Sequence, residues 1–183
     1  PIRSLMQRAL RVSAQQAQAV VSVCREIPQW MQREWGIEAA RCRVIRNGVD
    51  PSACVALDKT EARRRLGLSP DRPYIGFVGG FFPWHGLDTL VEAMALVRLE
   101  HPDTTLLLVG DGQTKPALEA LARQRGFEDA VSFVGRVAFD EVPWWIGASD
   151  LCVVLHRPVR LYPGDSMKLW EYLACARPVV ATA

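Results

Sequence analysis

Two stretches of the sequence combine glycine with charged or titratable side chains in a way that suits anion binding. In the first, Gly79 and Gly80 precede His85 and Gly86, just before a segment with helical apolar spacing. Glycine lets a backbone approach a ligand closely, and a helix N-terminus favours negative charge. The turn matches neither the dinucleotide nor the P-loop fingerprint. By itself it fits a tightly packed turn as well as a phosphate site.

The second stretch places Lys168 and Glu171 three residues apart on a helix predicted over 166–175, so they share a face. Ser166 is suited to cap this helix. On spacing alone the pair is an exposed ion pair worth about 0.2–0.5 kcal/mol. Its place after a predicted strand favours a ligand site instead. Three residues are expected to form the buried face of the helix: Leu169, Leu173 and Ala176.

These stretches fall in a region where short apolar runs alternate with segments of helical spacing. Continuous apolar runs are typical of parallel strands that helices cover on both faces. The predicted strands are 74–79, 105–109, 131–134, 151–155 and 178–181, and the helices between them begin near 86, 116, 139 and 166. Ligands of such sheets bind beyond the carboxyl ends of the strands. His156 and Arg157 also fall at a strand end, where a solvated loop is the favoured interpretation.

The first part of the chain follows a different pattern. It predicts helices over 2–18 and 26–35, strands over 19–23 and 43–45, a turn or linker at 47–51, and a small capped helix within 58–71. The last residues stop at the end of a predicted strand. Because parallel α/β domains rarely stop there, we expect the sequence to be a fragment of a longer protein at both ends.

Composition limits the partners and cofactors. With 22 basic and 20 acidic residues the net charge is +2, which argues against a polybasic nucleic-acid binder but leaves a local anion site open. No apolar run reaches the roughly 18 residues of a membrane span. The five cysteines form no C-x-x-C pair, so neither structural zinc nor a disulfide framework is expected. We also expect no catalytic metal.

Five segments, in their order along the chain, resemble the glycosyltransferase group 1 family. They are 44–50, 77–90, 107–112, 131–137 and 166–181. The resemblance implies an α/β, Rossmann-like parallel sheet with helices on both faces, as in the C-terminal domain of the two-domain GT-B fold, here truncated. Residues 1–48 would be the tail of the N-terminal acceptor-side domain with the linker. Residues 49–183 would be the donor nucleotide-sugar-binding domain, incomplete at its C-terminus.

The resemblance also implies roles for single residues. Glu171 would bind the ribose hydroxyls, and the backbone amides of Ser166 and Met167 would face the diphosphate of the donor. Gly79 and Gly80 would let the chain approach the phosphates. Arg136 and Val137, after Gly135, lie where the family reads the base, largely through backbone groups.

Two departures from the family pattern bear on the chemistry. The family's basic pair in the first loop, Arg and Lys, is replaced by Gly80 and His85. The first of its two glutamates, eight positions before Glu171, is Pro163, and Asp165 is the nearest substitute. His85 and Lys168 are therefore the candidates for the positive charge that stabilises the leaving diphosphate.

The implied function is retaining transfer of a sugar from a UDP-, GDP- or similar nucleotide sugar to a glycan or lipid-linked acceptor, in bacterial envelope or polysaccharide synthesis. The protein would work in the cytoplasm or at the inner face of the membrane, with peripheral membrane contact through other parts. The chain alone is expected to be inactive. Two alternatives stay open: a degenerate, non-catalytic GT-B partner subunit, and a sugar-nucleotide epimerase, which would need further acidic and histidine groups.

Overall fold

The computed structural model describes residues 2–157 and 166–182. Asp165 and Pro163 therefore lie outside the described residues. The chain separates into two compact units, the first ending at Gly48 and the second beginning at Val49. The smaller unit holds α1 (Ile2–Gln16), β1 (Val20–Ser22), α2 (Glu26–Trp35), η1 (Ala39–Arg41) and β2 (Cys42–Val44), with β1 and β2 paired in parallel. In the part that the structure describes, no helix is both long and apolar enough to cross a membrane.

The larger unit contains one five-stranded sheet. Its elements are α3 (Lys59–Leu66), β3 (Tyr74–Val78), η2 (Pro83–His85), α4 (Leu87–Glu100), β4 (Thr105–Val109), α5 (Lys115–Arg125), β5 (Val131–Gly135), η3 (Phe139–Glu141), α6 (Val142–Ala148), β6 (Leu151–Val154), α7 (Met167–Ala174) and β7 (Val179–Ala181). The strand order is β5-β4-β3-β6-β7, and each neighbouring pair is parallel. The predicted α/β sheet is confirmed.

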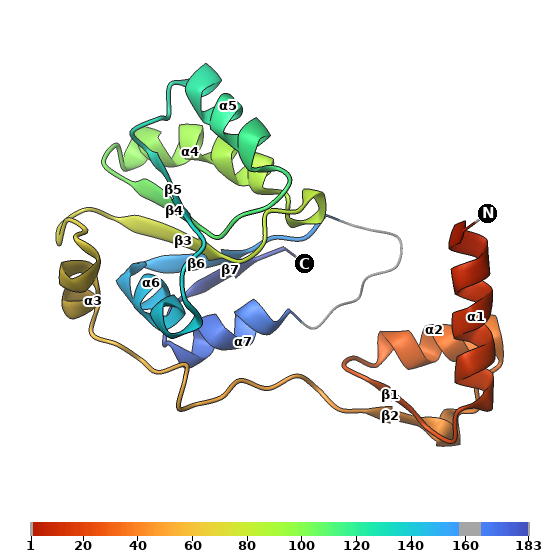
Figure 1. Ribbon diagram of the computed structural model, residues 1–183. Coiled ribbons are helices and arrows are strands. Elements are labelled where there is room, and N and C mark those ends of the chain that lie inside the picture. The colour runs from red at the N-terminus through yellow and green to blue at the C-terminus, as the bar shows by residue number, and fades with distance from the viewer. Residues whose placement is uncertain (1, 158–165, 183) are drawn as a thin grey trace. The chain divides into compact units, whose positions relative to one another are not determined.

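Helices cover the sheet on both faces. Figure 1 shows α4 and α5 on one face and α3, α6 and α7 on the other. Phe77, Leu106 and Leu108 are fully buried in the core under α4 and α5, while Ile146 of α6 and Cys152 of β6 are buried in the core on the opposite face. The two apolar layers explain why the strands read as continuous apolar runs rather than as alternating ones.

The buried face of α7 differs from the one that apolar spacing predicts. Tyr172 and Cys175 are fully buried, whereas Leu173 is 51% exposed. Ala176 lies beyond the last residue of the helix. The Tyr172 hydroxyl accepts a hydrogen bond from the Val78 N–H (2.8 Å) and donates one to the Val78 carbonyl (3.2 Å). These two bonds satisfy the hydroxyl inside the core, so a tyrosine takes the place expected for leucine.

At the amino ends of the strands a buried arginine ties α3 to the sheet. The Arg63 side chain donates to the carbonyls of Ala148 (3.0 Å) and Pro70 (2.5 Å) and to the Asp150 carboxylate (2.6 Å). Asp150 also accepts from the Tyr74 N–H (2.7 Å), at the start of the central strand. Arg63 and Asp150 thus stabilise the fold at the amino edge of the sheet, and the candidate site lies at the opposite, carboxyl edge.

Candidate functional site

A cavity of about 360 Å³ opens at the carboxyl ends of β3, β4 and β5. Four of the residues predicted to bind the donor line it together: Gly79, Gly80, Arg136 and Val137. The Arg136 guanidinium is largely exposed and lies 3.7 Å from a carboxylate oxygen of Asp111, which also lines the cavity. The parallel topology accounts for this grouping, because all three strands end at the same edge.

The loops that form this cavity are tied to one another through backbone groups. The Gly79 N–H donates to the Val109 carbonyl (2.9 Å), and the Gly110 N–H donates to the Gly135 carbonyl (2.7 Å). At Gly110, where φ is +132°, an added Cβ would lie 2.0 Å from the Gly79 carbonyl oxygen. The floor of the cavity is therefore one interlocked unit rather than three separate loops.

Lys168 and His85, the two predicted charge carriers, contact each other beside this floor. The Lys168 Nζ lies 3.3 Å from the His85 Nε2, and the His85 Nδ1 lies 2.6 Å from the Gly80 carbonyl oxygen. A carbonyl oxygen only accepts, so Nδ1 carries the hydrogen and Nε2 accepts from the ammonium group. The Lys168 Nζ also stands 4.5 Å from the centroid of the Phe77 ring, a cation–π contact.

Burial lowers the pKa of both Lys168 and His85. Burial, together with the charge of Lys168, lowers the pKa of His85 to about 4. Burial likewise lowers the pKa of Lys168 to about 8, although the nearby charge of Glu171 acts in the opposite direction. At neutral pH, His85 is thus uncharged and Lys168 is charged but close to its titration range. Buried groups with such shifted pKa values are typical of functional sites.

His156 joins this group, although sequence reasoning favoured a solvated loop for it. Its ring centroid lies 5.5 Å from that of His85, and burial and the charge of Lys168 lower its pKa. The backbone N–H of His156 donates to the hydroxyl of Thr182 (3.0 Å), the residue after β7. The available signal was its position directly after a buried parallel strand, at the edge where ligands bind.

The remaining predicted residues lie at and along α7. Ser166 is the N-cap residue, but its side chain makes no capping hydrogen bond, and Met167 is 55% exposed. Burial raises the pKa of Glu171, partly opposed by the charge of Lys168. Lys168 is hydrogen-bonded to His85 rather than ion-paired with Glu171, so the surface ion pair considered from spacing is not formed.

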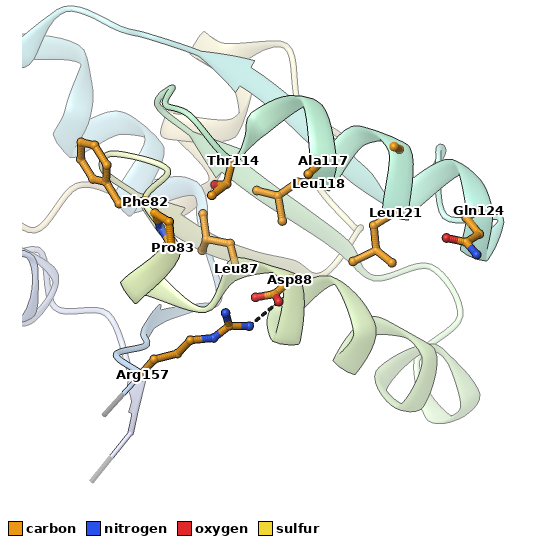
Figure 2. A pocket seen from close by; sticks show the side chains of 11 residues that line it. Phe82, Pro83, Leu87, Asp88, Thr114, Ala117, Leu118, Leu121, Gln124 and Arg157 are labelled. Atoms are coloured by element: carbon orange, nitrogen blue, oxygen red, sulfur yellow. Dashed lines mark hydrogen bonds and ion pairs between the residues drawn. The ribbon is translucent and has the colours of Figure 1, made fainter. Parts of the chain in front are cut away.

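A second cavity, of about 450 Å³, lies between α4 and α5. Figure 2 shows Leu87, Leu118 and Leu121 facing this space, with an ion pair between Asp88 and Arg157 at one end. The Arg157 N–H also donates to the Trp84 carbonyl in η2 (2.8 Å). Phe82 lines both cavities, so the turn that contains η2 separates them.

Comparison with known families decides the chain's membership. The family model described as glycosyl transferases group 1 matches residues 72–183, and the model described as glycosyltransferase family 4 matches residues 1–53. The chain belongs to the glycosyl transferases group 1 family. Among the residues that the structure describes, no group of three or more His, Cys, Asp or Glu side chains is arranged to hold a metal ion.

Curated relatives in this family include sugar transferases of several kinds. The chain is 33% identical over 179 residues to D-inositol 3-phosphate glycosyltransferase from Xylanimonas cellulosilytica, covering 90% of this chain and 40% of the relative. It is 32% identical over 146 residues to the lipopolysaccharide core biosynthesis mannosyltransferase LpsB from Rhizobium meliloti, covering 76% and 40%. The chain thus spans well under half the length of these relatives.

Solved structures confirm the Rossmann-like α/β fold of GT-B glycosyltransferases. Sucrose-phosphate synthase from Thermosynechococcus elongatus superposes with a TM-score of 0.81 at 27% identity, covering 98% of this chain and 44% of that one. Anabaena HepE, solved in complex with UDP and glucose, superposes with a TM-score of 0.78 at 25% identity, covering 97% and 48%. The Rossmann-like parallel sheet expected from the resemblance is therefore present.

Proposed function

We propose that the protein containing this chain is a retaining glycosyltransferase that moves a sugar from a nucleotide diphospho-sugar to an acceptor. The observation that carries the proposal is the Lys168–His85 contact beside a glycine-lined cavity, at the carboxyl edge of the sheet in a group 1 chain. A diphosphate needs backbone donors at close approach and a cation, and this edge offers both.

The chemical demand is departure of the nucleoside diphosphate while positive charge develops on the anomeric carbon. Lys168 is placed to stabilise the leaving oxygens as negative charge builds up, and such preorganised charge is the usual main contribution to catalysis. The proposed mechanism has the acceptor attack from the face of the leaving group, with a departing phosphate oxygen taking the acceptor proton. It requires no covalent enzyme intermediate.

Further roles follow for the other residues of the site. We assign the ribose hydroxyls to Glu171 and the base to the backbone around Arg136 and Val137. Gly79 and Gly80, which lack side chains, would let the chain approach the phosphates closely. The amides of Ser166 and Met167 would add the positive end of α7 to the phosphate site. A carboxylate suits a ribose because it accepts two hydrogen bonds at once.

The domain assignment and the biological setting belong to the same proposal. Residues 1–48 would form the end of the acceptor-side domain with the linker, and residues 49–183 most of the donor-side domain. Turnover would then need further chain, so we expect none from the 183 residues alone. The relatives named above suggest a glycan or lipid-linked acceptor, such as an envelope glycan.

The proposal is tested by measuring heat of binding and thermal stability of the protein with UDP-, GDP- and ADP-sugars. One nucleotide class should bind and raise the melting temperature, because a ligand that binds only the folded state stabilises it. Glu171→Gln should weaken that binding. The matched control is Glu119→Gln on α5, where the carboxylate lies 3.9 Å from the Lys115 Nζ. Absence of binding to every nucleotide sugar would refute the proposal.

One observation favours a second candidate, a non-catalytic partner subunit. Gly80 brings no charge to the first loop, and His85 is uncharged at neutral pH. A partner would keep its function after replacement of Lys168, whereas the enzyme would lose transfer with its fold intact. Measuring transfer in the protein with Lys168→Gln therefore separates the two.

A further inference from the structure

Three basic side chains from three separate elements meet at the carboxyl edge of the sheet. His85 comes from η2, His156 from the residues after β6, and Lys168 from the first turn of α7. We propose that these three residues form one proton-sharing cluster, which takes up a proton when the diphosphate of a nucleotide sugar binds. This inference rests on the proposed function and adds His156 and a pH dependence to it.

The geometry allows a single chain of contacts through the cluster. Gly80 holds the hydrogen of His85 on Nδ1, so the lone pair of Nε2 points at the Lys168 ammonium 3.3 Å away. His156 stands edge-on to His85 at 5.5 Å between ring centroids. Thr182 fixes the backbone of His156 from both sides, accepting from its N–H and donating to its carbonyl (3.4 Å).

The charged groups around the cluster leave it short of negative charge. On α7 only Glu171 acts electrostatically on Lys168, and it does so without an ion pair. On α4, Asp88 is paired with Arg157 instead. From β3 the neighbour is the Phe77 ring, 5.6 Å from His85. Within the described residues, none of the three basic groups thus forms an ion pair with a carboxylate.

Like charges at this separation oppose one another, so the free cluster does not hold all its protons. Burial and the charge of Lys168 lower the pKa of both His85 and His156, which are uncharged at neutral pH. A bound diphosphate reverses the sign of the local potential and raises these pKa values. The site would then gain, on binding, the positive charge that Gly80 does not supply.

The test is calorimetric titration of the protein at pH 7 with UDP-glucose and with GDP-mannose, each in two buffers of different ionisation enthalpy. A nucleotide sugar suits this purpose because its phosphates carry no group that titrates near neutrality, unlike a terminal phosphate. Any proton exchange then belongs to the protein. We expect uptake of about one proton, with affinity falling by up to about tenfold per pH unit as the pH rises.

Variants assign the proton to the cluster. His85→Asn and His156→Asn should each reduce the uptake by about half or more and flatten the pH dependence of affinity, by the loss of one titrating group. His101→Asn is the matched control, because His101 is exposed at the end of α4, away from the cluster. It should leave both quantities unchanged.

The outcomes separate the two proposals. Binding of a nucleotide sugar without proton uptake, or uptake that survives in both cluster variants, would overturn the proton-sharing cluster while the proposed function stands. Absence of binding by either nucleotide sugar would count against the proposed function itself. Imidazole ¹⁵N chemical shifts of His85 and His156, with and without ligand, provide an independent readout of protonation.

Discussion

The Nζ of Lys168 lies 3.3 Å from the Nε2 of His85, although the residues are 83 positions apart in the sequence. The contact joins the turn after β3 to the start of α7, so it forms only when β6 inserts beside the central strand. The pairing of Lys168 with His85 therefore exists only in the folded sheet, and no short segment of the sequence predicts it.

Replacing Lys168 should weaken donor binding specifically. Lys168→Gln is expected to reduce the affinity for the nucleotide sugar by about tenfold to a hundredfold, the usual effect of losing a hydrogen bond to a charged group. Calorimetric titration measures the change. The control is Lys115→Gln on α5, where the side chain has only a loose pairing with Glu119. An equal loss in both variants would contradict the assignment.

Replacing Tyr172 should destabilise the sheet rather than remove a ligand contact. Tyr172→Phe removes both hydrogen bonds to the half-buried Val78 backbone, at a cost of about 1–3 kcal/mol in the free energy of unfolding. Urea unfolding followed by circular dichroism measures it. Tyr74→Phe, which loses a single bond from the Ser69 N–H (3.0 Å), should cost less. The reverse order would argue against this role of Tyr172.

Replacing Gly79 tests the close approach of α7 to the first loop. Its φ of +146° disfavours other residues, and an added Cβ would lie 3.2 Å from the Lys168 Nζ. Gly79→Ala should lower the free energy of unfolding by about 1–3 kcal/mol and also weaken donor binding. The control is Gly48→Ala, where no atom lies within 4 Å of an added Cβ. Thermal unfolding of both variants gives the comparison, and equal stabilities would contradict it.

Replacing Arg63, at the amino edge of the sheet, should lower the free energy of unfolding substantially. Arg63 is 4% exposed, and Arg63→Met removes its hydrogen bonds to two carbonyls and to the Asp150 carboxylate, which keeps those from Lys59 and Tyr74. Breaking a buried charged pair typically costs about 3–5 kcal/mol, and the partial exposure of Asp150 places this variant near the lower end. Denaturant unfolding measures it. Arg64→Met, whose ion pair with Glu61 is exposed, should cost little.

Asp150 should make stability fall in acid. Burial acts to raise the pKa of Asp150, but hydrogen bonds from Lys59 and the Tyr74 N–H and the charge of Arg63 outweigh it and hold the pKa below its ordinary value of 3.8. The stabilisation is therefore complete above about pH 4 and is lost as the pH falls through the lower, folded-state value. Asp150→Asn should flatten this part of a stability-against-pH curve. An unchanged acid limb would contradict the assignment.

Alternation of apolar runs and helical segments was enough to predict the sheet and most of its helices. The small helix capped by Asp58 and closed at Gly67 was also predictable, because capping signals are local. The strand order was not, since it depends on long-range packing. The buried face of α7 was predicted wrongly because it was taken from the aliphatic residues alone, which left out Tyr172. The two hydrogen bonds to the Val78 backbone make burial of the Tyr172 hydroxyl favourable.

The candidate site was predictable only in part. Glycine-rich strand ends pointed to the cavity floor. Lys168 and His85 were singled out by their positions at the helix start and in the first loop, and the resemblance to the family implied their role as charge carriers. His156 was interpreted as part of a solvated loop. Its position after a strand indicated the edge where ligands bind, but not that its side chain lies against Lys168 and His85, which depends on long-range packing.

The interlocked glycine at position 110 has a consequence for how sequence variation in this protein should be interpreted. Any side chain there would collide with the Gly79 carbonyl, so a mutational scan will find this position intolerant. In such a scan, loss of function at Gly110 would be indistinguishable from loss of a substrate contact. Its cause, however, would be a steric clash between two loops. Libraries aimed at changing donor choice should therefore leave Gly110 fixed and vary the cavity residues whose side chains face open space, such as Arg136.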